Sequence, residues 1–236
     1  VIHAMGGEQD MRKMGGLAPH IRITWAMMLI GTLALTGFPL TAGYFSKDAV
    51  IEAAFASHAG PHMFAFALLV IAAFCTSFYS WRLAFMTFNG PTRADKETIE
   101  HSHESPMVML VPLFVLALGA VVAGFVFAPY FIGHEQELFW GSAIARTEIV
   151  EKIHESPAWV KYSPFVAMVA GFALAFIFYI RNTALPAKLA AMHRPIYEFL
   201  LNKWYFDELY DVLFVKPAFW LGRLFWKQGD GATIDG

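Results

Sequence analysis

The sequence predicts an all-α membrane protein with four transmembrane helices, the first one broken, and an amphipathic helix at the C-terminal end. The composition is the first reason, because 57% of the 236 residues are hydrophobic and only 15% are charged. Soluble domains are about 45–50% apolar and about 25% charged. The second reason is a set of long uncharged stretches, and the third is a proline flanked by glycines within the first of them. A soluble helical bundle would need polar faces on its outer helices, which these stretches lack.

Four stretches contain no Asp, Glu, Lys or Arg over enough residues to cross a membrane. A hydrocarbon layer about 30 Å thick requires roughly 20 helical residues. The stretches are Ile23–Ser46, Met63–Trp81, Ser105–Gly133 and Tyr162–Ile180. We therefore expect spans at about 23–57, 63–82, 106–129 and 158–181, within a transmembrane domain formed by residues 1–195.

Other global features exclude several classes of protein. The net charge of −2 gives no support to a nucleic-acid partner. The one cysteine, Cys75, lies in an apolar stretch and offers neither a disulfide framework nor a thiolate metal site. The chain begins at Val1 without a signal-peptide pattern. We expect it to be part of a longer protein.

The basic residues predict the orientation in the membrane. Most of the 17 Lys and Arg precede the first span, follow the second, or follow the fourth. The positive-inside rule then places the start of the chain, the loop at 82–104 and the C-terminal tail in the cytoplasm. The segment 129–161 should face outward, which in a bacterial cytoplasmic membrane is the periplasm.

The first span contains a predicted break at Gly37, Pro39 and Gly43. Proline has no backbone N–H, so Pro39 cannot donate to the carbonyl of Leu35, and the flanking glycines favour a break over a slight bend. Irregular backbone at membrane depth is tolerated only where it is buried in protein or lines a wet cavity. The break therefore predicts a functional region.

Three charged residues follow the break: Lys47, Asp48 and Glu52. On a resumed helix, Asp48 and Glu52 share a face at i, i+4, whereas Lys47 points about 100° away toward an apolar face. Ionisable groups within a membrane usually face cavities and carry function. The alternative is a lysine that has already reached the far interface and serves as a snorkelling anchor, and helix geometry leaves both interpretations open.

The tetrapeptide His-Glu-Ser-Pro occurs twice, at His103–Pro106 and His154–Pro157, each time just before a span. Serine is a good N-cap and proline suits the first helical position, so we expect two capped helix starts. A metal site at His101, His103 and Glu104 is the alternative. It lacks a second ligand pair at metal-binding spacing, and we expect no metal.

Two groups of small and hydroxylated residues lie inside the spans. Ala120 and Gly124 form a small-xxx-small pair that allows a neighbouring helix to approach closely. The segment 75–80, CTSFYS, carries several hydroxyl groups. Helix packing explains both groups most simply, while a hydrated path along the hydroxyls is the alternative.

The segment 196–236 has too many charges to span a membrane, yet its apolar residues recur at three-to-four spacing. This pattern predicts an amphipathic helix at the membrane interface or against the flanks of other helices. Asp207 is the expected N-cap, and Pro217 is expected to kink the helix. Asp211 and Trp220 lie on this helix as further candidates for contacts.

Four long stretches resemble one known family. They are GEQDMRKMGGL at 7–17, LTGFPLTAGYFSKDAVI at 35–51, SFYSWRLAFMTFNG at 77–90 and WYFDELYDVLFVKPAFWL at 204–221. Together they resemble the C-terminal half of subunit L of NADH-quinone oxidoreductase, the distal antiporter-like subunit of respiratory complex I. The resemblance covers nearly the whole chain and is weakest in the loop at 129–161.

The resemblance implies a role for the residues at the break. In that family the helix with the FSKD motif is discontinuous. Its lysine, here Lys47, belongs to a chain of proton-carrying residues, and Asp48 is the adjacent acidic partner. Glu52 is expected to modulate the affinity of Lys47 for its proton. A lysine rather than a glutamate at this position favours subunit L over the two related pumping subunits.

The resemblance also implies partners and cofactors. The tail resembles the start of a lateral helix that runs alongside neighbouring antiporter-like subunits, with Asp207, Asp211 and Trp220 as contacts. NADH, FMN, iron–sulfur clusters and quinone belong to other subunits, so no cofactor is expected in this chain. Further residues of the proton path belong to the earlier half of the family's proteins, and the present chain alone is not expected to pump. A subunit of a sodium/proton antiporter or of a membrane-bound hydrogenase, and a structural scaffold, are the alternatives.

Overall fold

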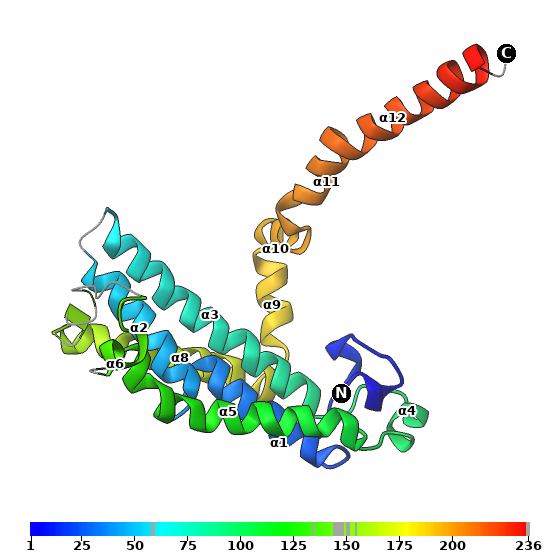
Figure 1. The fold of residues 1–236 in the computed structure, drawn as a ribbon. Coiled ribbons are helices and arrows are strands. Elements are labelled where there is room, and N and C mark those ends of the chain that lie inside the picture. Colours follow the sequence, from blue (N-terminus) through cyan, green and yellow to red (C-terminus); the bar gives the residue numbers. More distant parts are fainter. Residues whose placement is uncertain (58–59, 134, 144–148, 150–151, 154, 235–236) are drawn as a thin grey trace. The chain divides into compact units, whose positions relative to one another are not determined.

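The computed structural model describes residues 1–57, 60–133, 135–143, 149, 152–153 and 155–234 (Figure 1). The chain divides into two compact units, Val1–Thr183 and Ala184–Gly236. The described residues contain helices and no strand. The fold is therefore the expected all-α fold.

Three helices of the first unit are long and apolar enough to cross a membrane: α3 (His62–Phe88), α5 (Met107–Phe131) and α8 (Ala158–Phe176), which continues to Arg181 as a π turn. The first expected span is two half-helices of 15 residues each, α1 (Arg22–Thr36) and α2 (Ala42–Ala56). Each half rises about 22 Å at 1.5 Å per residue. The predicted break in the first span is confirmed.

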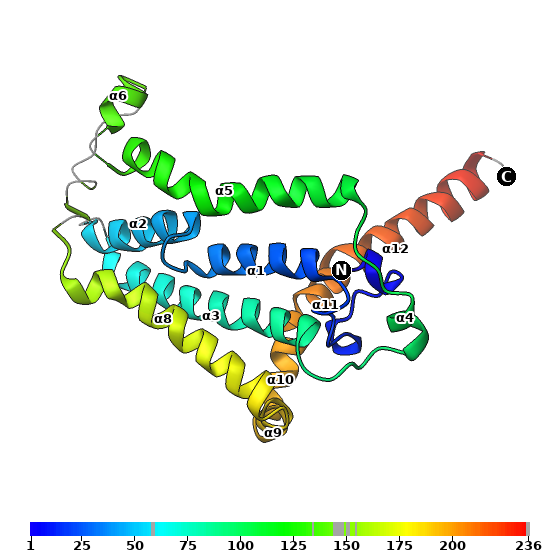
Figure 2. The ribbon, with the colours of Figure 1, turned by 90° about the horizontal axis from the view of Figure 1, so that it is seen from below.

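The half-helices α1 and α2 lie in the middle of this unit, with α5 on one side and α3, followed by α8, on the other (Figure 2). Small residues allow the close approaches. A Cβ added at Gly171 of α8 would lie 2.6 Å from the carbonyl oxygen of Phe74 on α3, and one at Gly124 of α5 would lie 2.3 Å from the ring of Phe45 on α2. The Ser77 hydroxyl donates to the Met168 carbonyl across α3 and α8, at 2.7 Å. The small residues and Ser77 thus serve helix packing, as expected.

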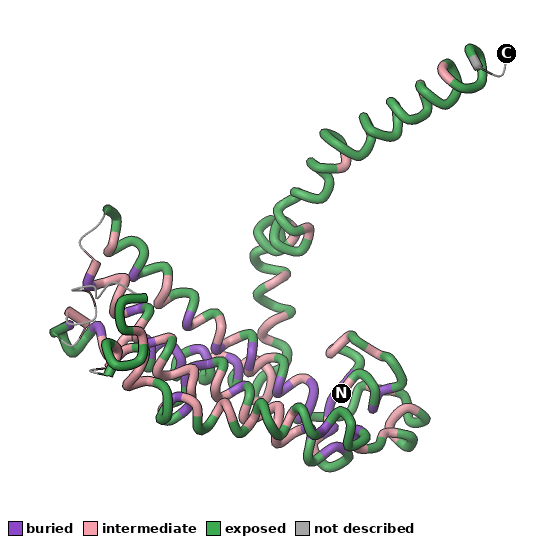
Figure 3. The backbone as a smooth tube through the Cα atoms, viewed as in Figure 1, coloured by how far each residue is buried: buried purple, intermediate pink, exposed green. Residues whose placement is uncertain are grey.

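Most apolar side chains of the long helices point outward. Helix α5 is the extreme case, because only Leu110 and Gly124 are buried on it, and Figure 3 shows most of its length as exposed. In a membrane the surrounding solvent is hydrocarbon, so apolar side chains can face outward without being exposed to water. The exposed surface thus agrees with the expected membrane location.

The segment before α1 packs against the end of α3. Met5, Leu17, Ile21 and Phe88 belong to one buried apolar cluster. Arg93, in the loop after α3, donates to backbone carbonyls on both sides of this contact, including those of Arg12 at 3.0 Å and Met86 at 2.6 Å. This arginine fixes the loop through hydrogen bonds to carbonyl oxygens.

The loop before α5 contains a cap that the sequence did not reveal. The Glu104 carboxylate accepts hydrogen bonds from the backbone N–H groups of Ile23, at 2.8 Å, and Thr24, at 3.2 Å, and also from the Thr24 hydroxyl. It therefore caps α1, whose first N–H groups have no partner within the helix. A carboxylate is favourable there because the N-terminal end of the helix dipole is positive.

The expected serine caps are wrong. The N-cap positions of α5 and α8 are Pro106 and Pro157, and neither helix start has a side-chain capping bond. The Ser156 hydroxyl instead donates to the Lys152 carbonyl at 3.4 Å. The second tetrapeptide begins at His154, which lies outside the described residues.

Replacing Glu104 should destabilise the start of α1. Burial raises the pKa of Glu104, but the hydrogen bonds from Thr24, Ile23 and Ser105 outweigh it, so that the pKa lies below the ordinary value of 4.5. A lowered pKa means that the cap contributes stability above pH 4.5 and loses it as the pH falls through the lowered value. We expect Glu104→Ala to cost about 1 kcal/mol, the typical cost of losing an N-cap.

The measurement is the apparent melting temperature of the purified protein at pH 7 and at pH 4. Glu100→Ala is the matched control, because Glu100 is an exposed residue of α4 (Lys96–Glu100). Equal melting temperatures of the two variants at pH 7 would show that Glu104 does not stabilise the start of α1.

The second unit is a succession of short helical segments: α9 (Leu185–Met192), α10 (Arg194–Leu201), α11 (Phe206–Tyr210), a π turn (Asp211–Val215), α12 (Lys216–Leu224) and a second π segment (Phe225–Ile234). Lys203, Trp204 and Tyr205 have positive φ and separate α10 from α11. Nearly all residues of this unit are exposed (Figure 3).

One local expectation for this unit needs correction. The N-cap of α11 is Tyr205, in a left-handed conformation, whereas Asp207 lies inside the helix and pairs with Lys203 at 2.7 Å. Pro217 stands in the first turn of α12, directly after the π turn. Proline suits a first helical turn, where its missing N–H costs no hydrogen bond, and the expected kink at Pro217 stays a prediction.

Candidate functional site

The candidate site begins at the break between α1 and α2. Gly37 caps α1 in a left-handed conformation, with φ of 80°, and Leu40 has φ of 72°. A left-handed backbone is easy for glycine but costs about 1–2 kcal/mol for other residues. The Thr41 hydroxyl donates to the Phe38 carbonyl at 2.7 Å, and α2 then begins at Ala42. The break is thus a defined turn with its own hydrogen bonds.

Gly43 allows α2 to pack tightly beside the end of α1. A Cβ at this position would lie 1.7 Å from the carbonyl oxygen of Ala34 and 2.8 Å from its carbon. Both atoms belong to the backbone and cannot rotate away. The absence of a side chain at Gly43 therefore sets how closely the two half-helices overlap.

Lys47 bridges the break. Its Nζ donates to the carbonyl oxygen of Leu35 at 2.6 Å. This is the carbonyl to which residue 39 would donate in a continuous helix, and Pro39 has no N–H to offer. The lysine thus replaces, from the second half-helix, a hydrogen bond that proline removes from the first. The sequence identified the freed carbonyl and the lysine but did not connect them.

Asp48 and Glu52 lie on another face of α2, together with Tyr44. These three residues are spaced at i, i+4 and i+8, so they form one row along the helix. Asp48 is only 9% exposed, and its carboxylate makes no hydrogen bond or ion pair with any residue that the structure describes. No ion pair joins it to Lys47 within the described part of the chain. The expected separation of the lysine from the two carboxylates is confirmed.

A cavity of about 600 Å³ runs along this row of α2. Tyr44 and Glu52, on either side of Asp48, both line it, and Pro39 brings the break itself to its wall. Its second wall is the start of α8 and the residues before it, namely Ser156, Ala158, Lys161, Tyr162 and Phe165. Such a volume holds many waters, since one water needs about 30 Å³ of liquid.

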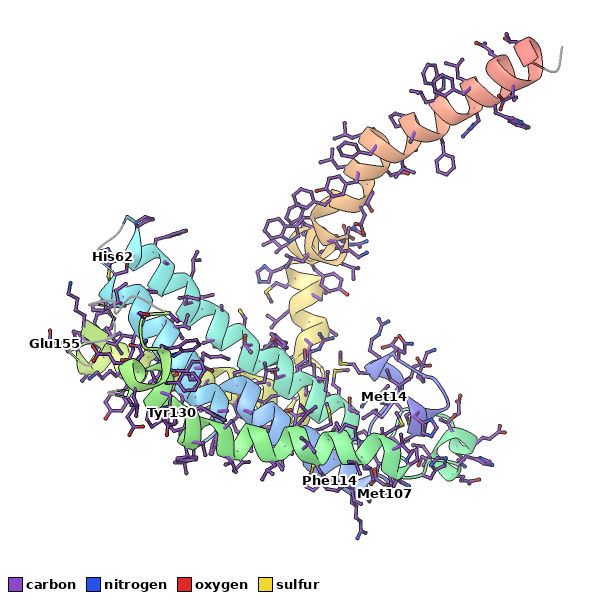
Figure 4. The ribbon with its side chains drawn as sticks, in the orientation of Figure 1. Met14, His62, Met107, Phe114, Tyr130 and Glu155 are labelled. Atoms are coloured by element: carbon purple, nitrogen blue, oxygen red, sulfur yellow. The ribbon has the colours of Figure 1, made fainter. Side chains whose placement is uncertain are left out.

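The cavity lies toward the end of the helices that the charge pattern places outward. Figure 4 shows His62 and Glu155 at this end, and Met14 and Met107 at the opposite end, near the capped start of α1. The lining residue Ser156 directly follows Glu155. The candidate site thus connects the break in the middle of the unit to one end of it.

The other predicted site residues lie in the second unit. Asp207 pairs with Lys203, Asp211 pairs with Lys216 at 2.9 Å, and Trp220 is exposed on α12. Each aspartate is thus engaged within its own segment. The contacts of these residues with a neighbouring subunit remain a prediction.

Two family models match this chain. Residues 1–77 match the model described as NADH:quinone oxidoreductase/Mrp antiporter, TM, and residues 79–232 match the model described as NADH dehydrogenase subunit 5 C-terminus. The first match contains the break and its charged residues. The second contains α5, α8 and nearly all of the described C-terminal unit.

Individual relatives agree with these models. NADH-quinone oxidoreductase subunit L of Rhodobacter capsulatus is 43% identical, in an alignment that covers 100% of this chain and 42% of the relative. Subunit L of Neisseria meningitidis serogroup B is 37% identical over 99% of this chain and 38% of the relative. NADH-ubiquinone oxidoreductase chain 5 of Marchantia polymorpha is 36% identical over 89% and 32%.

The chain spans less than half the length of these relatives. The second model alone covers more than half of the chain. The chain belongs to the family of NADH dehydrogenase subunit 5, which includes subunit L of the bacterial NADH-quinone oxidoreductases.

Proposed function

We propose that this chain is part of a membrane subunit of a proton-translocating NADH-quinone oxidoreductase, and that Lys47 takes up and releases the translocated proton. The hydrogen bond of Lys47 Nζ to the freed Leu35 carbonyl carries the proposal. It holds an ionisable group at a break in a membrane helix, where such groups usually have a function. NADH oxidation and quinone reduction belong to other subunits, with their FMN and iron–sulfur clusters.

The arrangement supports an outward release of the proton. Asp48 lies next to Lys47 in the sequence and between Tyr44 and Glu52, which line the cavity, so it can pass a proton from Lys47 toward water in the cavity. Glu52 lies four residues further along the same face, and its negative charge changes the electrostatic potential at Asp48 and Lys47. Lys47 and Asp48 are thus the proposed transfer groups, and Glu52 is a modulating group.

The proposed location is a bacterial cytoplasmic membrane, with the C-terminal tail in the cytoplasm. This orientation rests on the distribution of basic residues. The proposed partners are the lipid bilayer and neighbouring antiporter-like subunits, which Asp207, Asp211 and Trp220 would contact. The cavity then opens toward the periplasm.

Replacing Lys47 tests this function. In the full-length subunit, Lys47→Ala should leave the complex assembled but reduce proton pumping at least tenfold, since a lost proton-transfer group typically costs 10²–10⁴ in rate. The measurement is proton uptake by inside-out vesicles during NADH oxidation. Undiminished pumping would show that Lys47 is not a transfer group.

Two alternatives predict different results. A scaffold would be insensitive to Lys47→Ala but would lose assembly when the tail after residue 195 is removed. A sodium/proton antiporter of the same ancestry would show transport that depends on sodium; the name of the first family model includes an antiporter.

A further inference from the structure

Arg82, on α3, carries a positive charge without an acidic partner in the described part of the chain. Its Nε is buried and has no hydrogen-bond partner, and its guanidinium forms no hydrogen bond or ion pair with any residue that the structure describes. The guanidinium carbon lies 5.7 Å from the centre of the Tyr179 ring, which is within the range of a cation–π contact. A charge removed from water is costly unless an anion pairs with it, so we expect Arg82 to have an anionic partner from outside this segment.

Tyr179 and Arg181, at the end of α8, complete what we call the Arg82 site. Phe78, one turn before Arg82, holds the Tyr179 ring against α3, with 6.0 Å between the two ring centres. The Tyr179 hydroxyl likewise makes no hydrogen bond with a described residue. Arg181 is exposed and ends the same π turn. The Arg82 site thus offers a guanidinium and a hydroxyl as donors, with a second positive charge two residues further along.

The Arg82 site lies at the level of the lipid headgroups. Helices α3 and α8 run in the same direction (Figure 2), and the rings of Phe85 and Phe176 pair with 6.0 Å between their centres. Tyr179, three residues after Phe176, is therefore level with Phe88, the last residue of α3. The 27 residues of α3 rise about 40 Å, so each end of a centred helix projects about 5 Å beyond a hydrocarbon layer of about 30 Å. Arg82 starts about 9 Å before this end, and its guanidinium reaches Tyr179 as a snorkelling arginine does.

We propose that Arg82 and Tyr179 bind the phosphate group of an anionic phospholipid, in the leaflet that the charge pattern places on the cytoplasmic side. Phosphate is the anion that lipids supply at this depth, and basic pockets between membrane helices on the cytoplasmic side bind such headgroups. A guanidinium can donate two parallel hydrogen bonds to two phosphate oxygens. Arg181 adds attraction at longer range, so the site should favour an anionic lipid over a zwitterionic one, whose own cation is repelled. This role does not depend on that of Lys47.

The test uses the assembled complex with the full-length subunit, purified in detergent. The complex is titrated with a phosphatidylglycerol analogue that carries a photoreactive diazirine next to its headgroup. After illumination, mass spectrometry measures the labelling of residues 77–90 and 172–183. We expect Arg82→Gln to raise the half-saturating concentration by about tenfold or more, which is the usual effect of losing hydrogen bonds to a charged group. Tyr179→Phe keeps the ring and removes only the hydroxyl, so a smaller increase is expected.

Two further variants separate the geometry of the site from its charge. Arg22→Gln is the matched control, because Arg22 is an exposed arginine at the start of α1, on the same side of the membrane by the charge pattern. It should bind the analogue at the wild-type concentration. Arg82→Lys keeps the charge but cannot form two parallel hydrogen bonds, so it should fall between the wild type and Arg82→Gln. The recovery of assembled complex is measured for each variant, and Arg82→Lys and Tyr179→Phe decide the result if Arg82→Gln does not assemble.

Four outcomes would overturn the inference. The first is a half-saturating concentration that is the same in the wild type, Arg82→Lys and Tyr179→Phe. The second is equal labelling by a phosphatidylcholine analogue, and the third is competition by inorganic phosphate, which would assign the site to a soluble anion. The fourth is a wild type that is not labelled at this site while Arg82→Gln fails to assemble, because the partner of Arg82 would then be a carboxylate of another protein segment.

Discussion

Pro39→Ala should abolish most of the proton pumping while leaving the subunit in the complex. Alanine supplies the N–H that proline lacks, and this N–H competes with Lys47 for the Leu35 carbonyl. Removing a proline from a helix favours the continuous helix by about 3 kcal/mol, and relaxing the left-handed Leu40 adds about 1–2 kcal/mol. Together these shift the equilibrium toward an unbroken helix by a factor on the order of 10³. Lys47 then turns away from the break.

The measurement is the ratio of protons pumped to NADH oxidised in inside-out vesicles. Pro112→Ala is the matched control, because Pro112 lies inside α5 and is exposed, away from the break. Normal pumping by Pro39→Ala would mean that the break is not needed to hold Lys47 in its working position.

Gly43→Ala should have the largest effect on stability. The added Cβ would lie 1.7 Å from the Ala34 carbonyl oxygen, so the backbones of α1 and α2 must separate. Overpacking of this kind typically costs 1–3 kcal/mol, and more where only backbone can move. We expect little or no assembled subunit in the membrane.

The control is Gly31→Ala, on the same half-helix as Ala34. A Cβ at Gly31 meets no atom within 4 Å, and alanine favours a helix over glycine by about 1 kcal/mol. This variant should assemble normally, as judged by the amount of complex recovered and its apparent melting temperature. Equal recovery of the two variants would contradict the close contact at Gly43.

The broken first span could be predicted from the sequence because its causes are local. Proline and glycine act on the backbone within four residues, so Gly37 and Pro39 define the break without knowledge of the rest of the fold. The same locality explains why the faces of Lys47, Asp48 and Glu52 were predicted correctly. Helix geometry fixes such relations within one turn or two.

The groups that surround the site could not be predicted because they come from distant parts of the chain. The Glu104 cap on α1 joins residues about eighty positions apart. From the sequence we expected a local contact instead, in which Ser105 caps the helix that directly follows it, and this prediction is wrong. The cavity likewise needs the packing of α8 beside α2, which no local pattern encodes.

The partner of Lys47 is an intermediate case. Pro39 identifies the Leu35 carbonyl as unsatisfied, and a lysine is the nearest strong donor on the resumed helix. Whether its amino group can reach that oxygen depends on the angle of the turn at 37–41, which is set by the left-handed Gly37 and Leu40. The same turn brings the amino group of Lys47 to the break.

The proton-to-electron ratio of a Lys47→Arg complex tests the central claim most directly. Arginine keeps the positive charge and can donate to the Leu35 carbonyl, but it does not release its proton at any accessible pH. If Lys47 transfers protons, the complex should assemble and oxidise NADH with a clearly lowered ratio. A ratio equal to that of the wild type would contradict the account, because it would show that only the charge and the hydrogen bond of Lys47 matter.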